Sequence, residues 1–185
     1  MRMTVRSING MRASVKSLAW AASAGAVLWG LALSGRIGTV TAAWKTDLHR
    51  ILGAIACGFT ALHLVALVAD STVDFGLAEL AVPFASSWHA SAVAWGVVGM
   101  YLLALVEVSS LLRRRLTRRT WRRLHMASYG VFVAATAHYL TAGTDGGSSL
   151  SVAVIGVTSV AVGVLTVWRI VTASSIAQRV LADPR

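Results

Sequence analysis

The chain has few of the residues and motifs on which secreted and nucleotide-dependent proteins rely. Its single cysteine, Cys57, excludes an internal disulfide, and no Cys-x-x-Cys-His sequence occurs, so a covalently attached c-type haem is not indicated. No Gly-x-Gly-x-x-Gly occurs, and the longest connection between apolar segments, residues 70–87, is too short for a nucleotide-binding fold. Charged residues make up 13% of the chain, about half of their share in a soluble domain. This low charge argues against a soluble protein.

Apolar residues are correspondingly abundant. They account for 56% of the 185 residues, and the mean hydropathy is +0.69. A helix needs about 20 mostly apolar residues to cross the hydrocarbon of a membrane. We therefore expect an all-α, polytopic membrane helical bundle with about five transmembrane helices. This membrane domain would occupy residues 17–173, between a basic N-terminal tail (1–16) and a C-terminal tail (174–185). The expected spans are residues 17–34, 47–69, 89–112, 122–142 and 149–173.

The basic residues indicate how the spans are oriented. The net charge is +10, and seven of the 17 Lys and Arg residues lie within residues 113–123, between two apolar segments. Such clusters mark cytoplasmic loops in membrane proteins, so we interpret the charge as a topology signal and expect no nucleic-acid partner. The connection 70–87 is acidic and should lie outside. The basic tail 1–16 then also lies outside, against the usual rule, and the stronger central loop would override it.

Two of the expected spans each carry two histidines. His49 and His63 are 14 residues apart, and His125 and His138 are 13 residues apart, which corresponds to about 20 Å along a helix. Ionisable side chains are costly at membrane depth and mark functional sites. Because both spans run from inside to outside in this topology, His49 should face His125 near the cytoplasmic side. His63 should face His138 near the outer side. We call these the inner pair and the outer pair.

Paired imidazoles in a bundle of membrane helices favour haem. Neutral imidazole is a good iron ligand, and two axial imidazoles leave no open position, which suits electron transfer rather than oxygen binding. Small residues in both spans, among them Gly53, Gly58 and Gly130, would leave room for a porphyrin. The alternatives are interhelical hydrogen bonds for the histidines and ordinary helix packing for the small residues.

The 13-residue spacing conflicts with an ideal helix. At about 100° per residue, 14 residues return to within about 40° of the start, whereas 13 residues miss it by about 140°. His49 and His63 therefore share a face, and His125 and His138 do not. We expect the helix to be loosened at His125 or distorted near residues 128–130.

Three arginines beside the inner pair are candidates for contacts with a haem. Arg50, Arg122 and Arg123 adjoin His49 and His125 in the sequence. They could pair with the propionates of an inner haem, because Arg recognises carboxylates bidentately. Anchoring at the cytoplasmic face is the alternative for each of them.

Two further ionisable residues lie in the expected span 89–112. His89, at its outer end, is expected to be interfacial rather than a ligand. Glu107, about one turn from the cytoplasmic end, should snorkel or pair with an arginine of the following loop.

The two histidine segments resemble a known family. The sequence W-R-R-L-H-x12-H, from Trp121 to His138 after a basic loop, together with His49-x13-His63, is similar to the ferric reductase-like transmembrane domain. This superfamily includes ferric reductases, NADPH oxidases and the haem-binding membrane subunit of a bacterial sulfoxide reductase system. The resemblance covers residues 17–142, and the strings LHRILG, FASSW, AVAWGV and AGTD are similar to those of small stand-alone bacterial members.

This resemblance implies two b-type haems (heme b) with His49, His63, His125 and His138 as axial, metal-binding ligands, in a multi-pass protein of the bacterial cytoplasmic membrane. Oxidases and eukaryotic ferric reductases append a cytosolic FAD and NAD(P)H domain. We expect no such domain here, and we expect the first of the usual six spans to be missing. The electron donor is therefore expected to be a cytoplasmic flavoprotein or membrane quinol. The acceptor is expected to be an extracytoplasmic species such as ferric iron.

The expected function is thus transmembrane electron transfer, by an oxidoreductase component that depends on a partner. Two alternatives stay open. The first is a haem-free metal or proton transporter subunit that uses the same histidines, and the second is a structural haem anchor of a respiratory complex.

Overall fold

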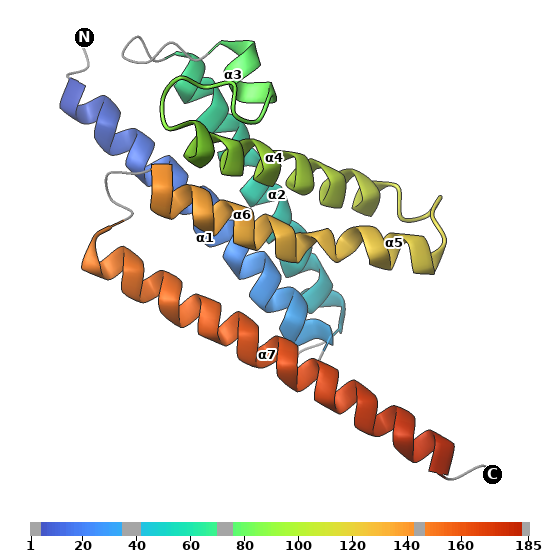
Figure 1. The fold of residues 1–185 in the computed structure, drawn as a ribbon. Coiled ribbons are helices and arrows are strands. Elements are labelled where there is room, and N and C mark those ends of the chain that lie inside the picture. Colours follow the sequence, from blue (N-terminus) through green and yellow to red (C-terminus); the bar gives the residue numbers. More distant parts are fainter. Residues whose placement is uncertain (1–4, 35–41, 70–75, 143–146, 183–185) are drawn as a thin grey trace.

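The structure is a computed structural model that describes residues 5–34, 42–69, 76–142 and 147–182, with the side chains of 5–16, 42, 43, 45 and 173–182 left out. The described residues form helices joined by turns and short loops (Figure 1). The all-helical fold class predicted from the sequence is therefore confirmed. The helices are α1 (Val5–Ser34), α2 (Ala42–Val68), α3 (Leu77–Ala81), α4 (Ala90–Leu111), α5 (Arg118–His125), α6 (Ala127–Ala142) and α7 (Ser149–Ala182).

Four of the five expected spans correspond to single helices. Among the described residues, four helices are long and apolar enough to cross a membrane, and each agrees with its predicted segment to within about one residue at either end. A multi-pass membrane protein follows from these helices. The four spans are Ser17–Ser34 in α1, Thr46–Val68 in α2, Ala90–Leu111 in α4 and Ser149–Thr172 in α7.

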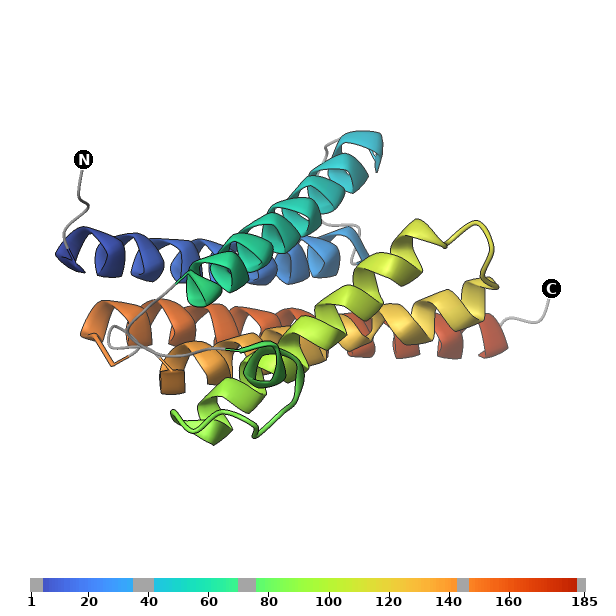
Figure 2. The same ribbon diagram turned by 90° about the horizontal axis from the view of Figure 1, so that it is seen from above.

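The fifth expected span, residues 122–142, is not a single helix. The chain forms α5 and α6 on either side of Met126. α6 has 16 residues, which corresponds to about 24 Å of helix. This is shorter than the hydrocarbon layer of a membrane, which is about 30 Å thick. The Tyr129 N–H donates to the Met126 carbonyl at 3.2 Å, an i to i+3 bond that tightens the turn. Figures 1 and 2 show that α5 continues the line of α6 beside α4. The predicted irregularity lies next to His125, and Gly130 is inside regular helix.

Two helices extend beyond their apolar spans. α1 begins at Val5, inside the predicted tail 1–16, and α7 continues to Ala182, beyond residue 173. α5 begins at Arg118 because the Thr117 hydroxyl caps it by accepting the Thr120 N–H at 3.1 Å. Hydropathy predicts only the apolar part of a helix, so it does not detect the polar ends of α1 and α7.

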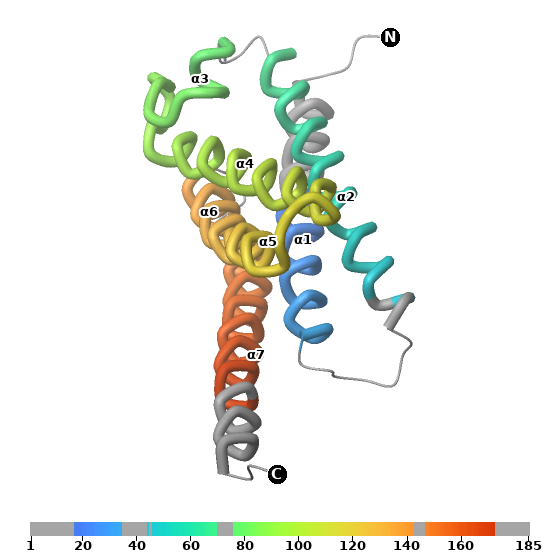
Figure 3. The backbone as a smooth tube through the Cα atoms, turned by 90° about the vertical axis from the view of Figure 1, so that its right-hand side faces the viewer, coloured from blue at the N-terminus to red at the C-terminus, as the bar shows by residue number. Residues whose placement is uncertain are grey.

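α1 lies at the centre of the bundle. It packs against α2 on one side and against α6 and α7 on the other, while α4 packs against α6 (Figure 3). The indole N–H of Trp20 in α1 donates to the Thr136 hydroxyl in α6 at 3.0 Å. The two histidine-bearing segments, α2 and α5–α6, therefore share α1 and α4 as neighbours. The core cluster joins Trp20, Ala24, Val27 and Leu31 of α1 with Phe132 and Tyr139 of α6 and Ile155 and Val162 of α7.

Candidate functional site: two facing histidine pairs

The four histidines form two facing pairs between α2 and α5–α6. The ring centroids of His49 and His125 are 5.8 Å apart, with the ring planes at 71°. Those of His63 and His138 are 6.2 Å apart, at 66°. All four side chains are half-buried. The structure therefore brings together the same partners that the predicted topology matched by depth, and α2 and α5–α6 run in the same direction (Figure 1).

The break at Met126 explains how His125 and His138, which are 13 residues apart, can both face α2. On an ideal helix His125 and His138 would point about 140° apart. His125 is the last residue of α5, and α6 begins at Ala127. The tightened turn between them changes the angular phase, so both imidazoles face α2.

In the inner pair, the two imidazoles are held by different means. Nδ1 of His49 lies 3.0 Å from the carbonyl oxygen of Ala26 in α1. The ring of His125 stacks on that of Trp121, one turn earlier in α5, with centroids 4.8 Å apart and planes at 22°. The Arg113 guanidinium lies 4.7 Å from the centre of the same indole. Nδ1 of His125 is buried and has no hydrogen-bond partner among the described residues.

In the outer pair, the histidine of α6 has a backbone partner. Nδ1 of His138 lies 2.8 Å from the carbonyl oxygen of Ala92 in the first turn of α4. A carbonyl oxygen only accepts, so a neutral imidazole donates through Nδ1–H in both hydrogen bonds. This tautomer leaves the Nε2 lone pair of His138, and of His49, available for a metal.

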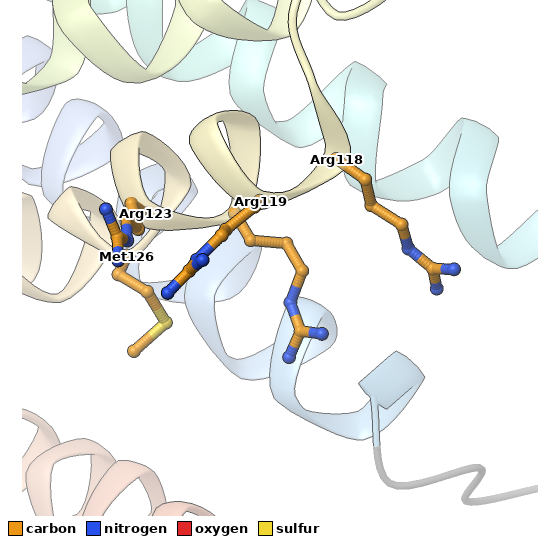
Figure 4. A pocket seen from close by; sticks show the side chains of 5 residues that line it. Arg118, Arg119, Arg123 and Met126 are labelled. Atoms are coloured by element: carbon orange, nitrogen blue, oxygen red, sulfur yellow. The ribbon is translucent and has the colours of Figure 1, made fainter.

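The three arginines predicted beside the inner pair are solvent-exposed. Arg122 and Arg123 line an open pocket on α5 together with Arg118, Arg119 and Met126 (Figure 4). The Arg50 guanidinium lies 3.8 Å from the Asp47 carboxylate, and both side chains are well exposed, so this pair contributes little to stability. Arg122 and Arg123 thus add positive charge to the last turn of α5, which ends at His125.

Sequence reasoning missed several contacts. The carbonyl oxygens of Ala26 and Ala92 carry no side-chain signal, so they were not foreseen as partners. Glu107 was expected to snorkel or to meet an arginine of the following loop. Its Oε1 instead lies 2.6 Å from the position that a Cβ on Gly53 would occupy, at the contact of α4 with α2.

His89 lies where the sequence predicted, at the outer end of α4. It is the N-cap residue, exposed, in the left-handed region with φ 42°, and its ring meets that of Trp88 with centroids 4.5 Å apart. These features agree with an interfacial position.

Comparison with known proteins identifies the family. A family model described as the ferric reductase like transmembrane component matches residues 19–136, which is more than half of the chain and contains His49, His63 and His125. No curated protein and no solved structure matches significantly. The chain belongs to the ferric reductase-like transmembrane component family, and transmembrane electron transfer is its general activity.

Proposed function

We propose that the chain carries electrons across the membrane through two b-type haems, one held by the inner pair and one by the outer pair. The observation that carries this proposal is the separation of the facing rings. Their centroids lie 5.8 Å apart in the inner pair and 6.2 Å apart in the outer pair.

These separations fit axial ligation of one metal between two imidazoles. Metal–imidazole bonds of about 2.0 Å place two opposing nitrogens about 4 Å apart, and the ring centres then lie about 6 Å apart. Both pairs are within about 0.5 Å of this value. The residues present therefore fit the group that the resemblance implies.

The number of ligands also favours haem over a bare metal ion. Among the described residues, no group of three or more His, Cys, Asp or Glu side chains converges as a metal site would. A porphyrin supplies four nitrogens in its plane, so two protein ligands complete an octahedral iron. A structural zinc site would require four protein ligands.

The residues of the chain would hold, orient and shield the two groups. Two histidines at each site would hold one haem and leave its iron no position for another ligand, and the bound group would supply single-electron exchange. The inner and outer histidines of α2 are separated by 14 residues, about 20 Å along the helix. Two haem sites at this spacing would divide the hydrocarbon layer, which is about 30 Å thick, into shorter steps for electron transfer.

The charge at the end of α5 suggests where electrons enter. We place this end at the cytoplasmic face of a bacterial membrane, on the positive-inside argument. The donor would be a cytoplasmic flavoprotein or membrane quinol, and the acceptor an extracytoplasmic species such as ferric iron. Arg122 and Arg123 share the last turn of α5 with His125, so we assign them, with Arg50, to the propionates of the inner haem.

The proposal is tested on the purified chain by a pyridine haemochrome assay with oxidised and dithionite-reduced spectra. Two b-type haems per chain are expected. The absence of haem from a chain expressed with ample haem supply would overturn the proposal. It would favour the alternative in which the histidines belong to a haem-free transporter subunit.

A further inference from the structure

The two histidines with backbone partners are held by the same short sequence. His49 hydrogen-bonds to the first residue of Ala26-Val-Leu-Trp-Gly30 in α1, and His138 to the first residue of Ala92-Val-Ala-Trp-Gly96 in α4. Both segments read A-V-x-W-G, where x is Leu or Ala. The two copies lie in different helices and serve different pairs, so one local arrangement is used twice.

The glycine of each copy lies beside the carbonyl that accepts the histidine proton. In an α-helix the carbonyl of residue i accepts the N–H of residue i+4, so the side chain at i+4 stands next to that oxygen. An ideal Cβ on Gly30 would lie 3.1 Å from Cε1 of His49. A Cβ on Gly96 would lie 2.8 Å from Cε1 and 2.9 Å from Nδ1 of His138. The imidazole reaches the carbonyl because no side chain stands there.

The other positions of the sequence have different surroundings. Val27 and Val93 are both buried, at 9% and 7% exposure, and contribute to packing. Trp29 contacts Trp44, with centroids 5.8 Å apart, whereas Trp95 is 43% exposed. The first position supplies the carbonyl that accepts the histidine proton, and the fifth position lies against the imidazole ring.

We propose that A-V-x-W-G is a cradle that positions one axial histidine of each haem, with Gly30 as the positioning residue for His49 and Gly96 for His138. The alanine carbonyl fixes the Nδ1–H tautomer and the ring orientation, and the glycine keeps that carbonyl accessible. Hydrogen bonding at the far nitrogen of a ligating histidine raises its basicity and stabilises the more oxidised metal. The haem role in this proposal rests on the proposed function, but the hydrogen bond and the tautomer do not.

The cradle makes the inner pair asymmetric. Within the inner pair, His49 is anchored by a carbonyl, whereas Nδ1 of His125 has no partner among the described residues and the ring is held by stacking on Trp121. One ligand of the inner site is therefore fixed by α1, which packs on α2, and the other by its own helix.

The first test needs no haem. Histidine labelled with ¹⁵N is incorporated into the full chain, and long-range ¹H–¹⁵N spectra assign the tautomer of each imidazole. We expect the Nδ1–H form for His49 and His138 in the unsubstituted chain. Gly30→Ala should change the tautomer signal of His49 and leave that of His138 unchanged, and Gly96→Ala should do the reverse. An Nε2–H form for both histidines in the unsubstituted chain would overturn the cradle, whether or not the variants fold.

The second test uses the haem-loaded chain in a redox titration. Gly30→Ala should raise the midpoint potential of the inner haem only, and Gly96→Ala that of the outer haem only, with transitions assigned from His125→Ala and His63→Ala. Gly25→Ala is the control, because a Cβ there meets only ordinary contacts with Leu52. Shifts equal to that of the control would overturn the positioning role. If the chain binds no haem, the proposed function fails while the tautomer test still decides the cradle.

Discussion

His49 near the start of α2 and His125 at the end of α5 face each other with ring centroids 5.8 Å apart. They come from helices that are far apart in the sequence, since α2 packs mainly on α1 and α5 mainly on α4. The pair is therefore produced by the assembly of the whole bundle rather than by one helix hairpin. The outer pair repeats this arrangement at 6.2 Å.

Replacing Trp121 should weaken the inner site selectively. Its ring stacks on His125 at 4.8 Å, and aromatic pairs of this kind contribute about 0.5–1.5 kcal/mol. Trp121→Leu should therefore lower the affinity of the inner haem by roughly 2- to 10-fold and leave the outer haem in place. Haem content during detergent washing measures this, with Trp168→Leu, an exposed tryptophan of α7, as the control. Equal loss of both haems from the two variants would rule out the stacking role.

The arginines assigned to propionates can be separated from those that only line the pocket. Arg122→Gln and Arg123→Gln should lower the midpoint potential of the inner haem, because each removes a positive charge that stabilises the reduced form. Arg118→Gln is the matched control, since Arg118 lines the same pocket at the start of α5. The measurement is a redox titration at low salt. Identical shifts for all three variants would assign the arginines to membrane anchoring.

The contact of Glu107 with Gly53 should govern the packing of α4 on α2. A Cβ on Gly53 would lie 2.6 Å from Oε1 of Glu107, so Gly53→Ala must displace a half-buried carboxylate and should destabilise the chain by about 1–3 kcal/mol. Gly58 has nothing within 4 Å of such an atom, and Gly58→Ala should gain up to about 1 kcal/mol of helix propensity. Thermal unfolding in detergent compares the two. A Gly53→Ala variant as stable as Gly58→Ala would contradict the packing described for Glu107.

The orientation of the chain is testable with single cysteines. In a Cys57→Ser background, Arg115→Cys should resist an impermeant maleimide added to intact cells, and Ser87→Cys should react. Both parent residues are exposed, so burial does not confound the comparison. The reverse labelling pattern would invert the inner and outer assignments.

The histidine pairing was accessible from sequence because it depends on two regular quantities, the rise of a helix and the alternation of spans across the membrane. Matching His49 with His125 required only that both helices run the same way. The helix break was also predictable, because two residues 13 positions apart do not lie on the same face of an ideal helix. Its position at Met126, rather than near Gly130, follows from local hydrogen bonding that hydropathy does not encode. As a result the span 122–142 was predicted as one helix and is two.

Other features could not be predicted because they depend on tertiary contacts. Nothing in the residues marks the carbonyls of Ala26 and Ala92 as hydrogen-bond acceptors for histidine. The repeat A-V-x-W-G was visible in the sequence, yet its meaning required the positions of His49 and His138. Glu107 likewise has no sequence pattern that connects it with Gly53.

The central claim, that each haem is held by one histidine from α2 and one from α5–α6, is tested most directly by the haem remaining in four single variants. Each of His49→Ala, His125→Ala, His63→Ala and His138→Ala should retain one b-type haem. We expect the first two to keep one haem with the same potential and spectrum, and the last two to keep the other. If His49→Ala and His63→Ala lose the same haem, or if any of the four retains both haems with paired-imidazole spectra, the account is wrong.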